Sequence, residues 1–316
     1  MATSTPLRPF SKSASTPEQL LQKLKNCSLT VANDAEALAY LRGVGAYRLK
    51  GYWHQVQDPV TKRFPAGYEF EDIRQRCELD REVRAATIEA VDRLEVAIRS
   101  VMANHLSLTH SPHWFLDARI FKPTEQWGIG KMVRKVEDEV GRAKGKAFIK
   151  HYFSQHDDPY LPPSWAISEC VSFGMWSRTY AILRDQNDKK TIAKRFGVDQ
   201  PQVFESWIHA LTVLRNLAAH HGQLLSVQFG VAPAGYKKAG ITFQQPKFFF
   251  AMATVVHYLL TQTGLPHRWK PALQAAFAAH PRVPVSELGF PASWDTARGW
   301  YGARQSSCRL GYAANG

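Results

Sequence analysis

Residues 71–108 read EDIRQRCELDREVRAATIEAVDRLEVAIRSVMANHLSL, which is the longest helical pattern in the chain. At 100° per residue, its apolar side chains gather on one face of a helix. That face contains Ile73, Cys77, Ile88, Val91, Ile98, Met102 and Leu106, and Glu78, Glu82, Glu89 and Ser100 fall opposite. The stretch therefore predicts a long helix with one buried side, in a fold built from helices.

Charged residues interrupt this apolar face. Asp80, Arg84 and Glu95 lie inside it, and Arg99 lies at its edge. Both acids precede an arginine by four residues, which is the favourable order for an ion pair on a helix. Because burial of a charge requires a partner or a ligand, we expect either structural ion pairs or pairs that also orient a site.

The rest of the chain also favours helices. No stretch shows a sustained two-residue alternation, so a large sheet is excluded, and the predicted class is all-α. Residues 57–70 are expected to form a loop or hairpin, and residues 271–316 irregular structure rich in Pro and Gly. The further helices expected are 18–25, 34–42, 131–152, 164–183 with an interruption at Phe173-Gly174, 188–196, 201–221 and 248–262.

The charge of the chain favours a polyanionic partner. Lys and Arg number 40 against 27 Asp and Glu, a net charge of +13 in 316 residues. Basic runs occur near residues 42–50 and 131–150, and for the second run a solvated helix face is the competing interpretation. The RNA-contacting candidates from these runs are Arg42, Arg48, Lys50, Lys131, Arg134 and Lys135.

Several classes of protein are excluded. The longest apolar run, residues 248–260, has 13 residues and includes His257, whereas a membrane-spanning helix needs about 20. The N-terminus has no apolar segment typical of a secretory signal, and the four cysteines lie at least 50 residues apart. We therefore expect a cytoplasmic protein with reduced thiols, no membrane association, no metal site and no cofactor.

The stretch most suggestive of chemistry is PQVFESWIHALTVLRNLAAHH, residues 201–221. Arg215 falls inside the apolar face of this predicted helix, so it must be paired, bind an anion or face a partner. Asn216 and His220 share a different face. Because Arg215 and His220 are roughly 140° apart on an ideal helix, two copies of the helix are better suited than one to build a common site. We therefore expect a homodimer or a pseudo-dimer.

These three residue types suit phosphodiester chemistry. An imidazole can exchange a proton near neutral pH, and a guanidinium can neutralise charge that develops on a phosphoryl group. In RNA the 2′-hydroxyl is an internal nucleophile, so no metal is required. The competing interpretation is a buried arginine salt bridge together with a histidine that interacts with the helix dipole.

Five blocks of the sequence resemble a known family. Arg215-Asn216-Leu217-Ala218-Ala219-His220 matches the R-x4-H motif of HEPN ribonucleases, including the Asn after the Arg. The order of the other blocks is similar to bacterial abortive-infection proteins of AbiD/AbiF type, from about residue 20 to 295. These blocks are residues 40–52 (YLRGVGAYRLKGY), Phe70 to Arg99, Pro163 to Tyr180, and Leu288-Gly289-Phe290-Pro291 with Trp294.

The resemblance implies a HEPN-like helical bundle with additional N- and C-terminal helices. It also implies a role in phage defence as a toxic ribonuclease, with RNA as substrate and a structured RNA as a regulator. The implied organisation is a disordered tail (1–16), an N-terminal helical and loop region (17–70), the HEPN-like core (71–230), a C-terminal helical extension (231–300) and a disordered tail (301–316).

The resemblance assigns Arg215, Asn216 and His220 as catalytic. Arg99 and His105, spaced R-x5-H, are a second candidate pair, with Glu95 and His221 as accessory residues. The competing interpretation places Arg99 on Glu95 and His105 on the core face.

The chain departs from the family at two positions. Members often have two tyrosines where Ala46-Tyr47 stands, and an Arg soon after the double His, where this chain has Gly222-Gln223. The second departure puts one phosphate contact in doubt.

Two functions thus remain open: a metal-independent endoribonuclease, and a non-catalytic RNA-binding or sensing module with an inactive HEPN core. The intact Arg215 and His220 favour the enzyme.

Overall fold

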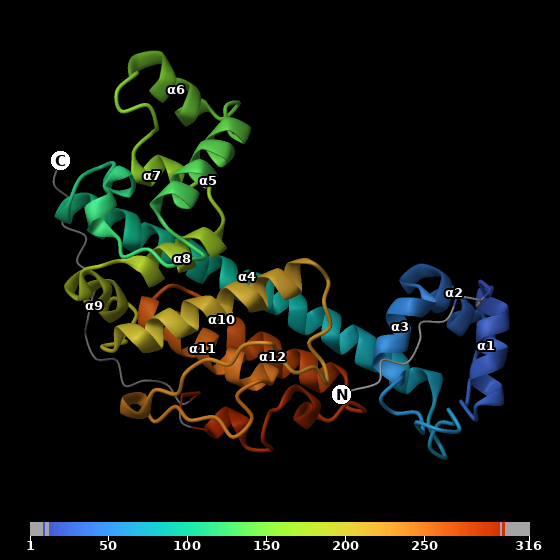
Figure 1. The fold of residues 1–316 in the computed structure, drawn as a ribbon. Coiled ribbons are helices and arrows are strands. Elements are labelled where there is room, and N and C mark those ends of the chain that lie inside the picture. Colours follow the sequence, from blue (N-terminus) through green and yellow to red (C-terminus); the bar gives the residue numbers. More distant parts are fainter. Residues whose placement is uncertain (1–8, 10–12, 298, 301–316) are drawn as a thin grey trace, which may run out of the picture. The chain divides into compact units, whose positions relative to one another are not determined.

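A computed structural model describes residue 9, residues 13–297 and residues 299–300 (Figure 1). The predicted tails at 1–16 and 301–316 lie largely or wholly outside these residues. The described chain contains twelve α-helices and no β-strand, which confirms the all-α class. The helices are α1 (Pro17–Asn26), α2 (Asp34–Val44), α3 (Ala46–Trp53), α4 (Phe70–Thr109), α5 (Ile129–Arg142), α6 (Ala147–Gln155), α7 (Ser164–Ile167), α8 (Phe173–Ile182), α9 (Gln186–Lys194), α10 (Pro201–Ala219), α11 (Phe249–Thr263) and α12 (Trp269–Ala279).

Short 3₁₀ segments complete the secondary structure at Trp114–Leu116, Ala118–Ile120, Lys237–Ala239, Val285–Leu288 and Trp294–Thr296. The chain divides into two compact units, unit 1 with residues 1–79 and 280–283, and unit 2 with residues 80–279 and 284–316. The division falls inside α4, after Leu79, rather than at the predicted boundary of 70 and 71. Residues 231–279 belong to the same unit as the predicted core.

Two expectations about the helices were wrong. The single helix predicted at 131–152 is two helices, because the chain turns at residues 143–146, where Gly145 offers little helix propensity. Residues 269–279 form α12, where irregular structure was expected from residue 271, and residues 46–53, for which no secondary structure was predicted, form α3. In α12 the strong helix formers of LQAAFAA outweigh Pro271, which lies in the first turn, where proline is tolerated.

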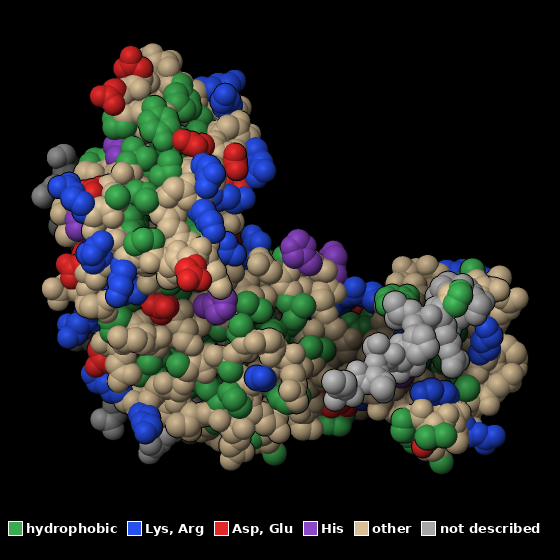
Figure 2. Space-filling model, viewed as in Figure 1, with side chains coloured by type: hydrophobic (Ala, Val, Ile, Leu, Met, Phe, Trp, Pro, Cys, Tyr) green, Lys and Arg blue, Asp and Glu red, His purple; other side chains and the backbone are tan. Residues whose placement is uncertain are grey.

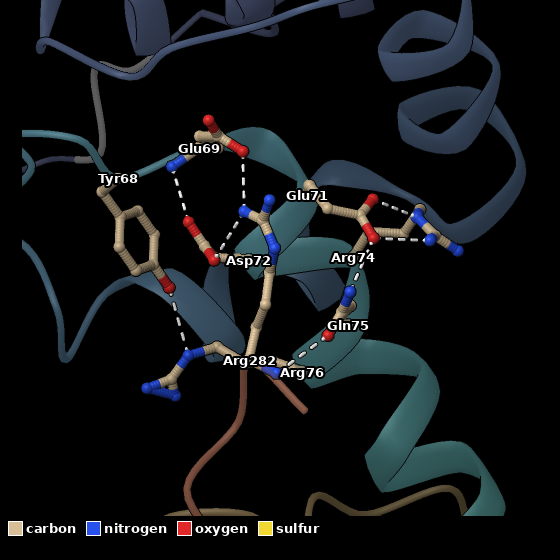
Figure 3. Close-up of polar contacts among 8 residues, drawn as sticks. All are labelled: Tyr68, Glu69, Glu71, Asp72, Arg74, Gln75, Arg76 and Arg282. Carbon is tan, nitrogen blue, oxygen red and sulfur yellow. Dashed lines mark hydrogen bonds and ion pairs between the residues drawn. The ribbon is translucent and has the colours of Figure 1, made fainter. Parts of the chain in front are cut away.

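In unit 1, polar contacts join the start of α4 to residues 280–283, which are distant in the sequence (Figure 3). Arg282 Nη1 lies 2.6 Å from Glu69 Oε2 and 3.2 Å from Asp72 Oδ1, and its backbone N–H donates to Gln75 Oε1. The α1 helix begins with a capping box between Thr16 and Gln19, which satisfies backbone donors at its first turn. These polar contacts add to a buried apolar core that includes Leu24, Leu49 and Trp53.

Unit 2 is a helical bundle in which α10 packs against α8, α9 and α11. Its core is rich in aromatic side chains. Phe204 of α10 stands edge-on to Tyr180 of α8, with 5.3 Å between ring centroids, and stacks on Phe196 at 5.1 Å. Trp207 is fully buried and donates from Nε1 to the carbonyl of Ala234 at 2.7 Å. Such dense packing gives α10 a fixed position from which its polar residues can act.

The apolar face of α4 is largely as predicted. Ile73, Val91, Ile98, Met102 and Leu106 are fully buried, whereas Ile88, at the edge of the face, is 43% exposed. In the described part of the chain, no helix is both long enough and apolar enough to cross a bilayer.

Candidate functional site

Helix α10 positions the predicted catalytic residues. It begins with Pro201 in its first turn and buries Phe204, Trp207, Ile208, Leu211, Leu214 and Ala218. It ends at Ala219, where Gly222 donates its backbone N–H to the carbonyl of Leu217 at 2.7 Å. A Cβ on residue 222 would lie 2.2 Å from Leu217 Cδ1, so a larger residue at 222 would force the Leu217 side chain to move. The glycine at this position therefore allows the chain to pass close to Leu217 at the end of the helix.

The Arg215 side chain meets α4 at a carboxylate. Arg215 Nε lies 3.4 Å from Glu95 Oε2, and the same carboxylate accepts a hydrogen bond from Arg99. The Glu95 side chain is only 7% exposed, whereas that of Arg215 is 40% exposed. Two guanidinium groups thus converge on one buried carboxylate, and one of them remains open to solvent. The ion pair predicted between Glu95 and Arg99 is confirmed.

Charges of both signs act on Arg99 in this cluster. Burial lowers the pKa of the Arg99 guanidinium, the charge of Arg215 adds to that change, and the carboxylates of Glu169 and Asp92 oppose it. Arg99 Nε is buried and has no hydrogen-bond partner among the described residues. Because a buried donor without a partner is costly, an acceptor such as a phosphate oxygen placed beside Arg99 Nε would be stabilising.

Asn216, His220 and His221 lie at the exposed end of α10. All three are exposed, and within the described chain neither imidazole forms a hydrogen bond. Arg215 Nη1 is 3.4 Å from Asn216 Oδ1. His220 caps the helix with φ −93° and ψ 21°, and His221 adopts the left-handed conformation with φ 59°. Figure 2 shows histidine side chains over this end of α10, where they are accessible to a large ligand.

The side chains of Arg215 and His220 do not contact one another in the described structure. The Arg215 side chain contacts Glu95 of α4, whereas the His220 side chain is exposed to solvent. This difference agrees with the roughly 140° that separates the two residues on an ideal helix. The expectation that a second copy completes the site therefore stays a prediction.

A buried aspartate anchors the segment that follows the two histidines. Asp80 Oδ1 accepts the backbone N–H groups of Leu224 and Leu225, both at 2.8 Å, and Asp80 also forms an ion pair with Arg84. Asp80 is fully buried, and Arg84 is 6% exposed. The predicted pair of α4 is therefore present, and it also fixes the loop beyond His221.

The second candidate pair is not assembled as a pair. Arg99 is engaged by Glu95, while His105 Nε2 lies 2.7 Å from Asp188 Oδ1. His110 Nε2 contacts the other oxygen of Asp188 at 2.8 Å. The competing interpretation for Arg99 is therefore the one observed, and His105 belongs to a separate cluster. That cluster could not be found from the sequence, because Asp188 lies 78 residues beyond His110.

The predicted RNA-contacting residues occupy exposed or half-exposed positions in both units. In unit 1, Arg42 pairs with Glu18 at 2.5 Å, and Lys50 is exposed on α3, where Arg48 is half-buried. In unit 2, basic side chains line α5 (Figure 2). Three of them bind groups of their own helix or the preceding loop: Lys131 the carbonyl of Gln126, Arg134 that of Gly130, and Lys135 the carboxylate of Glu139.

Among the described residues, no group of three or more His, Cys, Asp or Glu side chains has an arrangement that could hold a metal ion. The sequence expectation of no metal site stays a prediction for the whole chain.

Comparison with protein families gives one match. The model of the Abi-like protein family covers residues 39–226, which is 188 of the 316 residues. The chain belongs to the Abi-like protein family. The match begins in α2 and ends just beyond α10, so it contains Glu95, Arg99, Arg215 and His220 of this Abi-like protein. The family name associates it with abortive infection, a defence against phage. No curated protein and no solved structure matched it.

Proposed function

We propose that this Abi-like protein is a HEPN-type endoribonuclease of the AbiD/AbiF group that cleaves RNA by attack of the substrate's own 2′-hydroxyl. The observation that supports the proposal most is the convergence of Arg99 and Arg215 on Glu95, with exposed histidines at the end of the same α10 helix. This arrangement offers a partly exposed guanidinium for a phosphate and an imidazole for proton transfer.

Each residue has a distinct role in the proposed reaction. His220 takes the proton from the 2′-oxygen as that oxygen attacks phosphorus. The bond between phosphorus and the 5′-oxygen breaks, and the 5′-oxygen takes a proton from an acid such as a second imidazole. Arg215 holds the non-bridging oxygens as charge develops on them, and Asn216 orients the phosphate or His220. The products are a 2′,3′-cyclic phosphate and a 5′-hydroxyl.

Glu95 acts through the arginines rather than on the substrate. Its carboxylate is nearly buried and is already engaged by two guanidiniums, so it is a poor metal ligand and a good clamp for Arg215. Holding a flexible arginine in one conformation reduces the entropy lost when the phosphate binds. Glu95 is therefore a positioning residue.

The alternative is a non-catalytic RNA-binding or sensing module. The exposed cations of α5 would serve this function equally well. The exposed and unpaired state of His220 favours the enzyme, because an RNA-binding module needs no imidazole at that position.

End-group analysis of RNA cleaved in excess EDTA tests the proposal. The wild type is expected to leave cyclic phosphate ends without added metal, and His220→Ala to leave the RNA intact. His209→Ala is the matched control, because His209 is also exposed on α10 but lies about three turns earlier than the histidines of the proposed site. Cleavage that is lost in EDTA and restored by Mg²⁺, or ends that carry a 3′-hydroxyl, would overturn the mechanism.

A further inference from the structure

Among the described residues of unit 2, eight large hydrophobic side chains are exposed, and four of them are aliphatic: Ile88, Val96, Leu108 and Leu265. The other four are aromatic: Phe148 (38% exposed), Phe153 (45%), Tyr160 (52%) and Trp165 (51%). All four lie within 18 residues, on α6, on α7 or in the segment between them. Figure 2 shows hydrophobic side chains over α6 and α7 with basic side chains nearby. Exposed rings in one cluster require a reason, since large apolar side chains normally lie in the core.

Two of these rings line a cavity of about 330 Å³. Phe148 and Trp165 form it together with His151, Tyr152, His156, Pro163, Ala166 and Glu169. Tyr152 is held in place, because its hydroxyl donates to the carbonyl of Pro159 at 2.6 Å. The cavity is therefore lined by flat rings and imidazoles, with a rigid tyrosine among them.

One lysine borders the same cavity, and the segment that leads to it is basic. Lys146 Nζ lies 5.7 Å from the centre of the Phe148 ring and donates to the backbone carbonyl of Glu169 at 2.9 Å. Between residues 131 and 150 there are seven Lys or Arg side chains against three acids, a local charge of +4. Flat rings next to cations are the combination with which proteins bind single-stranded nucleic acid, where bases stack and the backbone follows positive charge.

One acidic residue links the cavity to the proposed catalytic cluster. Glu169 lines the cavity, and its charge acts on the Arg99 guanidinium, which shares Glu95 with Arg215.

We propose that the cavity between Phe148 and Trp165 is a stacking subsite for an unpaired base of single-stranded RNA, next to the Arg99–Glu95–Arg215 cluster. The inference rests on the proposed function for its choice of RNA, and it adds the class of substrate: an unpaired strand. A base inside a duplex is already stacked on its neighbours and cannot enter such a cavity. Phe148 and Trp165 offer flat faces on which a base can stack, and this favours a base as the occupant of the cavity.

Trp165 makes the subsite measurable. All nine tryptophans lie among the described residues, and Trp165 is the only exposed one. The full-length His220→Ala protein, which is expected not to cleave, is titrated with a fluorescently labelled ten-nucleotide single-stranded RNA and with the corresponding blunt duplex. The expected result is quenching of tryptophan fluorescence by the single strand, and none in the Trp165→Phe variant.

Affinity gives the second readout. Adding Trp165→Ala is expected to weaken single-strand binding by about 5- to 150-fold, which is the usual effect of losing one stacked base. Trp165→Phe is expected to retain most of the affinity, because a flat ring remains. Leu265→Ala is the matched control, since Leu265 is also an exposed apolar residue of unit 2, 42% exposed and outside the cavity.

The outcomes separate this inference from the proposed function. Unchanged affinity in Trp165→Ala, or equal effects on duplex and single strand, would overturn the stacking subsite even if the wild type cleaves RNA. Conversely, Trp165-dependent binding by a wild type that never cleaves RNA would support the subsite and overturn the nuclease.

Discussion

Replacing Asp80 by alanine is expected to lower the free energy of unfolding substantially. Asp80 is fully buried, accepts the backbone N–H groups of Leu224 and Leu225 and forms an ion pair with Arg84, which is itself 6% exposed. The substitution therefore leaves a buried guanidinium without this carboxylate and two buried N–H groups without this acceptor. Leu224 and Leu225 are both fully buried, so water cannot easily replace the carboxylate.

The magnitude follows from these losses. Removing one partner of a buried ion pair costs at most about 3–5 kcal/mol, and less here because Arg84 has a further interaction. Each buried N–H left without an acceptor costs about 1–3 kcal/mol. The losses overlap because one carboxylate serves all three groups, so we expect a decrease of about 5 kcal/mol in the free energy of unfolding. Asp80→Asn keeps an oxygen for the N–H groups and is expected to lose about half as much, since hydrogen bonds to a charged group are roughly twice as strong as neutral ones.

Urea denaturation followed by circular dichroism measures the effect. The matched control is Glu89→Ala on the same helix, where Glu89 pairs with Arg93 at 2.6 Å with both side chains more than 40% exposed. Such an exposed i,i+4 pair contributes about 0.3–0.5 kcal/mol. If Asp80→Ala were no more than about 1 kcal/mol less stable than Glu89→Ala, the role of Asp80 as the anchor of residues 224 and 225 would be refuted.

Four further outcomes are expected. Expression of the wild type in bacteria slows growth, and Arg215→Ala or His220→Ala relieves it; equal toxicity at matched protein levels would contradict the assignment. RNA affinity, measured by filter binding, falls about a thousandfold between 50 and 200 mM salt if about six phosphates are contacted, and a flat salt dependence would exclude backbone contacts. Light scattering of the active species shows a dimer, and mixing Arg215→Ala with His220→Ala restores cleavage if each site uses both copies; an active monomer would contradict this. Burial, with the charges of His267 and Lys270, lowers the pKa of His257 to about 4. The neutral imidazole therefore stabilises the fold fully above pH 6.5, and the free energy of unfolding decreases by about 3 kcal/mol as the pH falls from about 6.5 to about 4. In urea titrations at several pH values, His257→Gln should lack this decrease.

The sequence by itself determined the helical class and the principal elements of unit 2. The 3.6-residue period of residues 71–108 predicted α4, and the proline at 201 and glycine at 222 predicted the ends of α10 to within two residues. It also predicted the ion pairs of α4, because residues four apart on a helix are neighbours whatever surrounds them. These features depend on local geometry, which the order of residues fixes.

The local sequence pattern gave wrong helix predictions where helix periodicity and helix-breaking residues occur in the same stretch. The basic stretch 131–152 has a helical period throughout, but the turn at residues 143–146 divides it into α5 and α6. Helix α12 was not predicted, because residues 271–316 as a whole are rich in proline and glycine. Its formation also buries Trp269 and Leu273 in unit 2. Helix propensity is a weak influence that tertiary burial readily outweighs.

Only the tertiary structure decided which charges meet across the chain. Arg215 and Glu95 are 120 residues apart, and nothing in either local sequence indicates the other; their contact depends on how α10 packs in unit 2. The contacts of Asp80 with Leu224 and of His105 with Asp188 also join residues that are far apart in the sequence. The place of Glu169, which lines the aromatic cavity and whose charge acts on Arg99, likewise depends on the tertiary structure. The physical reason is that periodicity identifies the buried face of a helix but not its partner, which is chosen by the packing of the whole core.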